Sequence, residues 1–368
     1  MLKLLISIGT GGELIKMAPV MRELQKRKID YFFLNTGQHD LTDMIKQLEV
    51  KKPDKEFHEH KDKSKRGRFK TIPQALAWGF VKLFKRIRKT IKQSKAKYVL
   101  VHGDTMTTGL TSLVVSTMPG VRLVHIEAGL RSKALFEPFP EEISRIITDS
   151  LTKIHLTPTH YAAAHLKRKK DVYITGNTNI DSLQFALNKI KNKKKSKEKY
   201  LIAKTHRQEN IKSKKRLTNF VNILLNTKHK IYFIMANSTK KALEKYNLLD
   251  KLKKKKNINI INELPYLDFI KLYRDCTAIL TDGGGETEEA THLKKPCIVY
   301  RHATERQEAE VIGVARRVKS NTNEALKHIE EAFNTKSKFS KTVKASECPY
   351  GDGKASKRII DYLLKASS

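Results

Sequence analysis

Five short segments of this chain place ionisable residues or glycines directly after an apolar run. They are GTGGE at 9–13, HGDT at 102–105, EAGLR at 127–131, the T-H-R triplet at 205–207 and DGGG at 282–285. Carboxylates and histidines can transfer protons, and glycines let a backbone come close to a ligand. One such turn is weak evidence, because Gly and Asp are ordinary loop residues. Five together predict an enzyme whose site lies in a cleft.

The glycine run at 283–285 stands between an apolar run and a helical pattern. The free N–H groups and the positive dipole end of a helix N-terminus suit a phosphate. Glu288 and Glu289, in the first turns of this helix, could accept ribose hydroxyl hydrogens. The alternative is a tight strand–helix turn with glutamates that favour the dipole. The turn at 9–12, followed by Lys16, is a second phosphate candidate, although it does not match the GxxxxGK[ST] pattern.

A further helix is predicted to start at Pro140, since proline is favoured at the first helical position. Glu141 and Arg145 are four residues apart and share one face of this helix. The pair is either a surface ion pair or a carboxylate held by a cation beside a sugar.

Short apolar runs alternate with helical patterns along the chain, which indicates parallel sheets covered on both faces. The strands predicted before the lysine-rich stretch are 2–8, 31–34, 98–101, 121–126 and 154–156, and those after it are 200–203, 231–235, 258–261, 278–280 and 297–300. The main predicted helices are 71–95, 213–226, 265–274 and 284–293. Two successive sets predict an α/β protein of two Rossmann-like, doubly wound domains. Such sheets bind ligands at the carboxyl ends of their strands, where the five segments lie.

Length and composition exclude several other classes of protein. A chain of 368 residues is long enough for two domains. No apolar stretch approaches the 18–20 residues of a membrane-spanning helix, and the run at 4–8 is too short for a signal peptide. The three cysteines form no CxxC pair, so a disulfide framework or a cysteine zinc site is not expected, and a reducing cytoplasm fits.

The formal net charge of +36 raises the question of a nucleic-acid partner. Lysines crowd the stretches 61–70, 84–97, 189–199 and 251–256, and the stretch 84–97 reads as an amphipathic helix with a solvated basic face. Lysine outnumbers arginine, whereas base and phosphate recognition favours arginine forks. We therefore interpret the excess as solvated surface, with a polyanion-binding surface as the alternative.

The motifs resemble those of a known family, the non-hydrolysing UDP-N-acetylglucosamine 2-epimerases, over nearly the whole chain. The matches, in order, are GTGGELIKMAPVMREL at the start, TGQH at 36–39, HGDT at 102–105, HIEAGLRS at 125–132, PEEISR at 140–145, TGNTNID at 175–181, HRQEN at 206–210, TDGGGETEEA at 281–290, KKPCIVYR at 294–301, TERQEA at 304–309 and YGDGKASKRI at 350–359.

The resemblance implies the glycosyltransferase-B fold, in which two Rossmann-like domains face a cleft. Residues 1–168 would form the N-terminal domain with the acid/base residues, and residues 169–352 the UDP-binding domain. Residues 353–368 would form a helix that crosses back to the N-terminal domain. A homodimer is also implied, with no metal and no cofactor.

The implied reaction is reversible inversion at C2 of UDP-GlcNAc to UDP-ManNAc, through elimination of UDP and a 2-acetamidoglucal intermediate. It would supply ManNAc-type sugars for cell-surface glycans. Matching the motifs position by position gives Asp104, Glu127, Glu141 and His206 as catalytic candidates. The substrate-binding candidates are Lys16, Arg131, Arg145, Arg207, Phe269, Gly283, Gly284, Gly285, Glu289 and Arg306.

The chain departs from the family pattern at positions that would face the phosphates. Gly11 and Gly12 stand where the family usually has Arg-Pro, and Gly283 stands where it has Ser. Thr287 replaces Gln, and Gln307 replaces Pro. A charge-assisted hydrogen bond contributes about 1.5–3 kcal/mol. Loss of two such contacts would weaken nucleotide binding by orders of magnitude unless backbone N–H groups or nearby lysines substitute.

Two alternatives to the epimerase follow from these departures. One is an enzyme of the same fold that epimerises or hydrolyses a different UDP-sugar. The other is a relative that has lost catalysis and binds polyanions. The retained carboxylates at 104, 127 and 141 argue against the second alternative.

Overall fold

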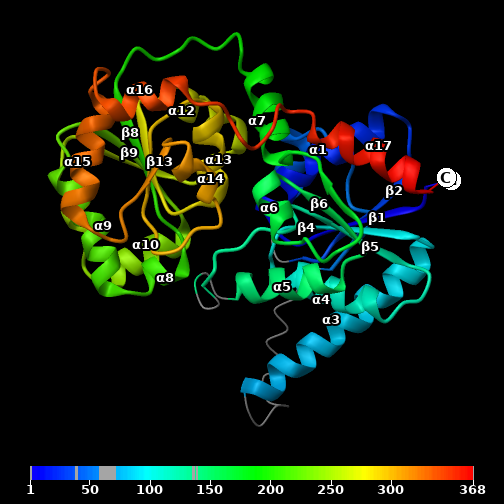
Figure 1. Cartoon of the computed structure of the whole chain (residues 1–368). Coiled ribbons are helices and arrows are strands. Elements are labelled where there is room, and N and C mark those ends of the chain that lie inside the picture. The colour runs from blue at the N-terminus through cyan, green and yellow to red at the C-terminus, as the bar shows by residue number, and fades with distance from the viewer. Residues whose placement is uncertain (1, 38–39, 58–71, 135–136, 138–139, 368) are drawn as a thin grey trace. The chain divides into compact units, whose positions relative to one another are not determined.

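The computed structural model describes residues 2–37, 40–57, 72–134, 137 and 140–367. Contacts within the chain divide it into two compact units. The N-terminal unit comprises Met1–Leu130, Phe139–Ser182 and Gly353–Ser368. The C-terminal unit comprises Arg131–Pro138 and Leu183–Asp352. Each unit contains one sheet (Figure 1).

The sheet of the N-terminal unit is parallel, and its strand order is β3-β2-β1-β4-β5-β6-β7. Its strands are β1 (Leu4–Ile8), β2 (Tyr31–Asn35), β3 (Lys55–Glu56), β4 (Tyr98–His102), β5 (Arg122–Ile126), β6 (Ile154–Thr157) and β7 (Val172–Ile174). The order 3-2-1-4-5-6 is that of the Rossmann fold, in which the chain reverses direction across the sheet between β1 and β4. The turns after these two strands therefore lie at the ligand-binding switch point.

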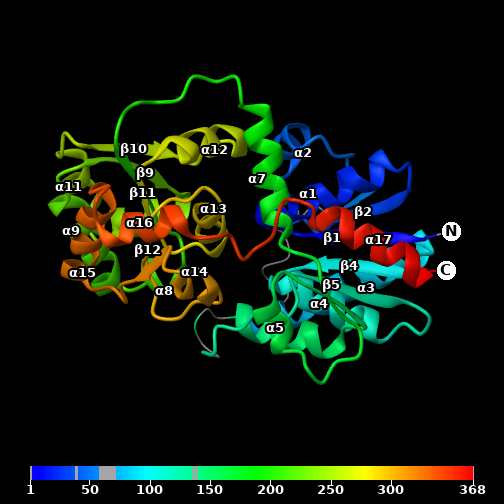
Figure 2. The same ribbon diagram turned by 45° about the horizontal axis from the view of Figure 1, so that its top comes forward.

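Helices cover both faces of this sheet, α1 and α17 on one and α3, α4 and α5 on the other (Figures 1 and 2). The helices of this unit are α1 (Gly11–Lys26), α2 (Thr42–Gln47), α3 (Ile72–Ser94), α4 (Met106–Ser116), α5 (Glu141–Leu151), α6 (His160–Ala164), α7 (Thr178–Lys189, which runs on into the C-terminal unit) and α17 (Ala355–Ser367). A core on the α3–α4 face contains Leu5, Ile87, Val99 and Val114, all fully buried. In α3, Ile87 and Ile91 are buried while Lys85 and Lys89 are exposed, which confirms the amphipathic pattern.

The sheet of the C-terminal unit repeats the same order, β10-β9-β8-β11-β12-β13, again with parallel neighbours. Its strands are β8 (Tyr200–Lys204), β9 (Lys230–Met235), β10 (Ile258–Asn262), β11 (Ala278–Thr281), β12 (Cys297–Val299) and β13 (Ala315–Arg317). Its helices are α8 (Gln208–Ile211), α9 (Lys214–Asn226), α10 (Asn237–Lys245), α11 (Leu249–Lys253), α12 (Tyr266–Asp275), α13 (Gly284–His292), α14 (Gln307–Val311), α15 (Thr322–Phe333) and α16 (Lys338–Ala345). Helices α9 and α15 cover one face, and α12 and α13 the other (Figure 2). Here the switch point lies between β8 and β11.

The predicted α/β architecture of two doubly wound domains is confirmed, and all ten predicted strands are present with ends shifted by at most two residues. Strands β3, β7 and β13 were not predicted, because each has only two or three residues and carries little periodicity. The division by contacts falls after Ser182 rather than after residue 168. The difference arises because β7 pairs with β6 and therefore belongs to the N-terminal unit.

Helix α17 lies in the N-terminal unit, although residues 183–352 of the other unit precede it. Asp181 caps its start by accepting hydrogen bonds from the backbone N–H groups of Ala355 (3.1 Å) and Ser356 (2.8 Å). Arg27, at the end of α1, pairs with Asp361 at 2.6 Å. The helix thus completes the layer of α1 over the sheet.

Within the described part of the chain, no helix is long and apolar enough to cross a membrane. The lysine-rich stretch at 191–199 is exposed throughout, as expected for solvated surface. Residues 38–39 of the TGQH motif and the lysines at 61–70 lie outside the described residues.

Candidate active site

The turn after β1 is organised around the buried carboxylate of Glu13. It accepts hydrogen bonds from the backbone N–H groups of Gly9 and Thr10, both at 2.8 Å. It also accepts hydroxyl hydrogens from Thr105 (2.7 Å) and Thr108 (2.8 Å), which follow β4. Burial raises the pKa of Glu13, and these hydrogen bonds only partly oppose the rise. The N–H groups of Gly9 and Thr10 are therefore already engaged by this carboxylate.

Lys16, one turn into α1, forms an ion pair with Glu127 instead. Its Nζ lies 2.6 Å from Oε1 of Glu127, and the two side chains are 17% and 6% exposed. Glu127 has a φ of 71°, a left-handed conformation that is uncommon outside glycine and costs on the order of 1–3 kcal/mol. Its backbone N–H donates to the Leu156 carbonyl at 3.0 Å, which helps to hold that conformation. The hydrogen bond to Leu156 and the ion pair with Lys16 therefore hold the strained backbone and the carboxylate of Glu127 in place.

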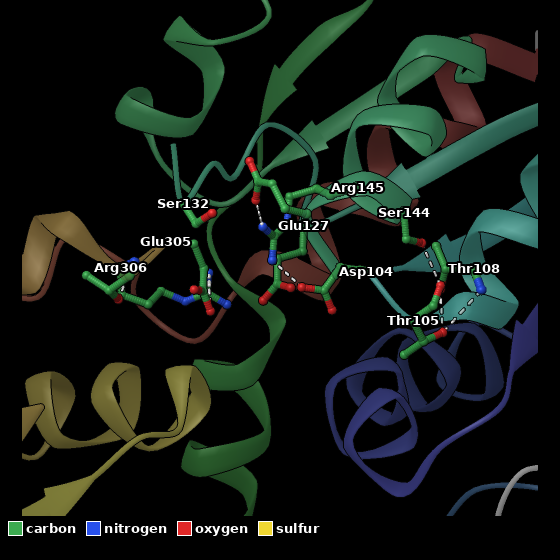
Figure 3. Close-up of polar contacts among 12 residues, drawn as sticks. Asp104, Thr105, Thr108, Glu127, Ser132, Ser144, Arg145, Glu305 and Arg306 are labelled. Atoms are coloured by element: carbon green, nitrogen blue, oxygen red, sulfur yellow. Dashed lines mark hydrogen bonds and ion pairs between the residues drawn. The ribbon is translucent and has the colours of Figure 1, made fainter. Parts of the chain in front are cut away.

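Arg145 of α5 forms an ion pair with Asp104, which follows β4 (Figure 3). It forms a second ion pair with Glu142. Arg145 and Glu142 are almost fully buried, whereas the Asp104 side chain is 23% exposed. The Ser144 hydroxyl donates to the Thr105 carbonyl at 2.7 Å and fastens α5 to the same turn. Asp104 is thus a solvent-accessible carboxylate fixed by a buried guanidinium.

Spacing predicted that Arg145 shares a helix face with Glu141, and both residues lie on α5. Arg145 forms ion pairs with Glu142 and Asp104. Glu141 is the first residue of α5 and is half-buried. Glu141 directly precedes Glu142, at the N-terminal end of the helix that carries Arg145. The predicted carboxylates at 104 and 127 each have a cation as direct partner.

His125 and Asp149 connect the two turns that carry these carboxylates, and no role was predicted for either residue. His125 Nδ1 lies 2.7 Å from Asp149 Oδ1, and Nε2 lies 2.8 Å from the Gly103 carbonyl oxygen, to which it donates. Asp149 Oδ2 also accepts from the Gly129 backbone N–H at 3.2 Å. The imidazole thereby ties the backbone beside Asp104 to the strand that leads into Glu127. A histidine within the apolar part of β5, between Val124 and Ile126, was the signal in the sequence.

In the C-terminal unit, Asp282 at the end of β11 is the centre of a buried network. It accepts from the Thr205 hydroxyl at 2.6 Å, from the backbone N–H groups of His206 and Arg207 at 3.1 Å, and from the Asn210 amide at 3.0 Å. Burial alone would raise the pKa of Asp282, but His206 and these hydrogen bonds hold it well below its usual range. The ionised carboxylate lies 3.1 Å from Nδ1 of His206 and so orients the imidazole.

The glycine run leaves little room for side chains. Gly283 is the N-cap of α13, and a Cβ there would lie 1.7 Å from Oε2 of Glu286. A Cβ at Gly284 would lie 2.7 Å from Oε1 of Glu305. Gly285, half-buried, follows in the first turn of α13. A side chain at 283 or 284 would therefore have to displace the carboxylate that packs against the run at that position.

The predicted arginines of the C-terminal unit belong to an acidic network beside this run. Arg306 is buried and pairs with Glu288, and it lies next to Glu305 (Figure 3). Arg207 reaches the same Glu305 at 3.6 Å. Arg131 is half-buried, and its carbonyl accepts from the Gln307 amide at 3.4 Å.

Glu289 and Phe269 lie on the two helices that cover this face of the sheet. Glu289 of α13 is 4% exposed, and the Tyr266 hydroxyl is 3.5 Å from its Oε1. Phe269 of α12 is half-buried, with its ring centroid 5.1 Å from that of Tyr273. The structure thus gathers the predicted residues of each unit at that unit's own switch point. No group of three or more potential metal ligands occurs among the residues described.

Comparison with known sequences identifies a family. Residues 22–364 match the family model described as UDP-N-acetylglucosamine 2-epimerase. The chain is 33% identical to the UDP-N-acetylglucosamine 2-epimerase of Methanocaldococcus jannaschii, with 98% of this chain and 99% of the relative covered. It is 32% identical to that of Campylobacter jejuni, with 100% and 98% covered.

Comparison with solved structures identifies the same family. The Methanocaldococcus jannaschii UDP-GlcNAc 2-epimerase in complex with UDP-GlcNAc and UDP aligns with a TM-score of 0.86 at 32% identity, covering 99% of this chain and 100% of that one. The Neisseria meningitidis enzyme bound to UDP-GlcNAc aligns with a TM-score of 0.87 at 30% identity, covering 99% and 100%. MurG of Acinetobacter baumannii shares the fold alone, with a TM-score of 0.59 at 12% identity, covering 99% of each chain. These alignments confirm the predicted glycosyltransferase-B fold.

Proposed function

The chain belongs to the UDP-N-acetylglucosamine 2-epimerase family, and we propose that it interconverts UDP-GlcNAc and UDP-ManNAc by inversion at C2. One observation in the structure carries this proposal most directly. Two carboxylates of the N-terminal unit, Asp104 after β4 and Glu127 after β5, are each held by a cation, Arg145 and Lys16. Carboxylates fixed in this way can remove and return a proton without losing their orientation.

The proposed chemistry is an elimination followed by an addition. A base removes the C2 proton, the C1–O bond to UDP breaks with its electron pair passing to the diphosphate, and a C1–C2 double bond forms. Addition of UDP at C1 and protonation of C2 from the opposite face then give the epimer. Asp104, Glu127 and Glu141 are the proposed acid/base groups.

The proposed binding groups divide between the two units. Arg145 and His206 would stabilise the departing diphosphate and the sugar, since charged and hydrogen-bonding groups act most strongly where charge develops. In the C-terminal unit, the glycines at 283–285 would face the phosphates, Glu289 would bind the ribose, and Phe269 would lie by the uracil. Arg131, Arg207 and Arg306 complete the proposed set.

Product analysis with a panel of UDP-sugars tests this function. Incubation with UDP-GlcNAc should yield UDP-ManNAc, and the variants D104N and E141Q should yield far less. Release of free UDP and free sugar without epimer would favour hydrolysis instead. Salt-sensitive nucleic-acid binding without turnover would favour the polyanion-binding alternative.

A homodimer, a cytoplasmic location and a role in supplying ManNAc-type sugars for cell-surface glycans also belong to this proposal. They are supported by family membership. Sedimentation at micromolar protein concentration tests the first, with a mass of twice 42.2 kDa as the expected result.

A further inference from the structure

A buried ion pair at the switch point of the C-terminal unit has no role in the function proposed above. Lys204 is the last residue of β8, and Glu286 lies in the first turn of α13, which follows the neighbouring strand β11. Nζ of Lys204 is 2.6 Å from Oε1 of Glu286, and the side chains are 21% and 12% exposed. The pair therefore lies largely out of solvent, at the carboxyl ends of the two strands where this fold binds ligands.

Glu286 fixes the ammonium directly beside the glycine run. Its other oxygen, Oε2, would lie 1.7 Å from a Cβ at position 283. The carboxylate thus occupies the space that a serine side chain would need at that position. Glu286 therefore links the two features: one of its oxygens lies where a side chain at position 283 would be, and the other binds Lys204.

Lys204 also lies near the residues assigned to the other parts of the nucleotide. Its Nζ lies 5.3 Å from the centroid of the Phe269 ring, the proposed neighbour of uracil. Burial lowers the pKa of Lys204, but Glu286 first, and then Glu289 and Glu263, raise it above its ordinary value. The lysine is therefore a cation that is stabilised electrostatically by Glu289, the proposed ribose ligand.

We propose that Lys204 is a further nucleotide-binding residue, whose ammonium contacts the phosphate attached to the ribose of the UDP-sugar. This inference rests on the proposed function. An ammonium can donate three hydrogen bonds. Within the described part of the chain one is donated to Glu286, which leaves donors for a phosphate oxygen. Lys204 supplies a cationic hydrogen-bond donor beside Gly283, where the family usually has the hydroxyl of a serine.

Titration calorimetry with UDP and with uridine tests this assignment, because only UDP carries the phosphates. We expect K204M to raise the Kd for UDP by about 10–100-fold, as for loss of a charge-assisted hydrogen bond. The Kd for uridine should change by no more than about threefold, and K204R should recover most of the UDP affinity. UDP binding by K204M within about twofold of the wild type, or equal weakening of UDP and uridine, would show that the pair is only structural.

Two further variants keep the test decisive. K204M leaves the largely buried Glu286 without its cation, which can prevent the single variant from folding. The double variant K204M/E286Q removes both charges and replaces K204M in that case. The double variant should also lose much of the preference for UDP over uridine. Lys251, exposed in the same unit, provides the matched control K251M, which should leave both affinities unchanged.

Epimerase assays on the wild type separate this inference from the proposed function. UDP binding that depends on Lys204, without formation of UDP-ManNAc, would overturn the function and leave the assignment of Lys204 intact. A wild-type protein that does not bind UDP would overturn the assignment.

Discussion

At the residue scale, two of the candidate catalytic carboxylates, Asp104 and Glu127, form ion pairs with Arg145 and Lys16. Asp104 and Arg145 are 41 residues apart in the sequence, and Lys16 and Glu127 are 111 apart. The positions of all four residues could be predicted from their motifs. Their pairing could not, because it depends on which strands lie side by side in the sheet. Partly buried pairs of this kind contribute more to orientation than to stability.

Replacement of Asp104 by asparagine should abolish most of the activity while leaving the fold intact. The amide keeps the shape of the side chain but cannot act as a base, so kcat should fall by about 10²–10⁴-fold. Steady-state kinetics with UDP-GlcNAc provides the measurement. The matched control is D250N, at an aspartate that is 84% exposed in the C-terminal unit, and it should leave kcat unchanged. Retention of more than about a tenth of kcat in D104N would remove Asp104 from the chemistry.

Gly283 should not tolerate the serine that the family usually carries. In G283S the new Cβ would lie 1.7 Å from Oε2 of Glu286, so we expect a loss of about 1–3 kcal/mol in the free energy of unfolding. Denaturant unfolding of G283S, E286A and the double variant gives the coupling between the two positions. The double variant should be more stable than the sum of the single changes predicts. Simple additivity would mean that Glu286 does not set the requirement for glycine.

At the scale of elements, the strand–helix alternation allowed the parallel sheets and their helices to be predicted, because buried parallel strands read as continuous apolar runs. The short strands β7 and β13 and the exact division between the units were not predictable from pattern alone. The networks around Glu13, His125 and Asp282 were also missed, since each joins the ends of different strands through side chains far apart in sequence. The sequence also did not indicate that two N–H groups of the turn after β1, those of Gly9 and Thr10, are bound by Glu13.

The first turn of α13 should contribute to acid sensitivity. Burial alone would raise the pKa of Glu286, but Lys204 and then His206 lower it from 4.5 to about 2. Because the folded-state pKa is depressed, this stabilisation is complete above about pH 5 and is lost as the pH falls from about 5 towards 2. The shift corresponds to about 3 kcal/mol.

Thermal unfolding of the wild type and E286Q between pH 7 and pH 3 measures this contribution. The difference in Tm between them should narrow as the pH falls, because the amide introduced by E286Q does not titrate. A difference that stays constant across this range would contradict the assigned role of the ionised carboxylate. E244Q, in α10 of the same unit, provides an exposed control that should follow the wild type.

At the scale of the whole molecule, the net charge of +36 contrasts with carboxylates concentrated at the switch points. The lysine excess lies largely on exposed stretches such as 191–199. Such a field attracts anionic nucleotide-sugars and can partly compensate for the arginine absent at position 11.

Salt should therefore weaken UDP binding more steeply here than in a relative that retains that arginine. Screening shortens the reach of surface charge from about 10 Å at 0.1 M to about 3 Å at 1 M ionic strength. The measurement is the Kd for UDP of both proteins across this range. Equal slopes would leave the lysines as solvated surface without a part in binding.

The proposed epimerisation requires this chain to move a proton at C2 of a UDP-sugar. The most direct measurement is incubation with UDP-GlcNAc in deuterated water, followed by NMR of the sugar. We expect deuterium at C2 in both recovered UDP-GlcNAc and newly formed UDP-ManNAc, and no deuterium at C2 after incubation with D104N. Wild-type protein that binds UDP but leaves C2 fully protonated, with no UDP-ManNAc formed, would contradict it.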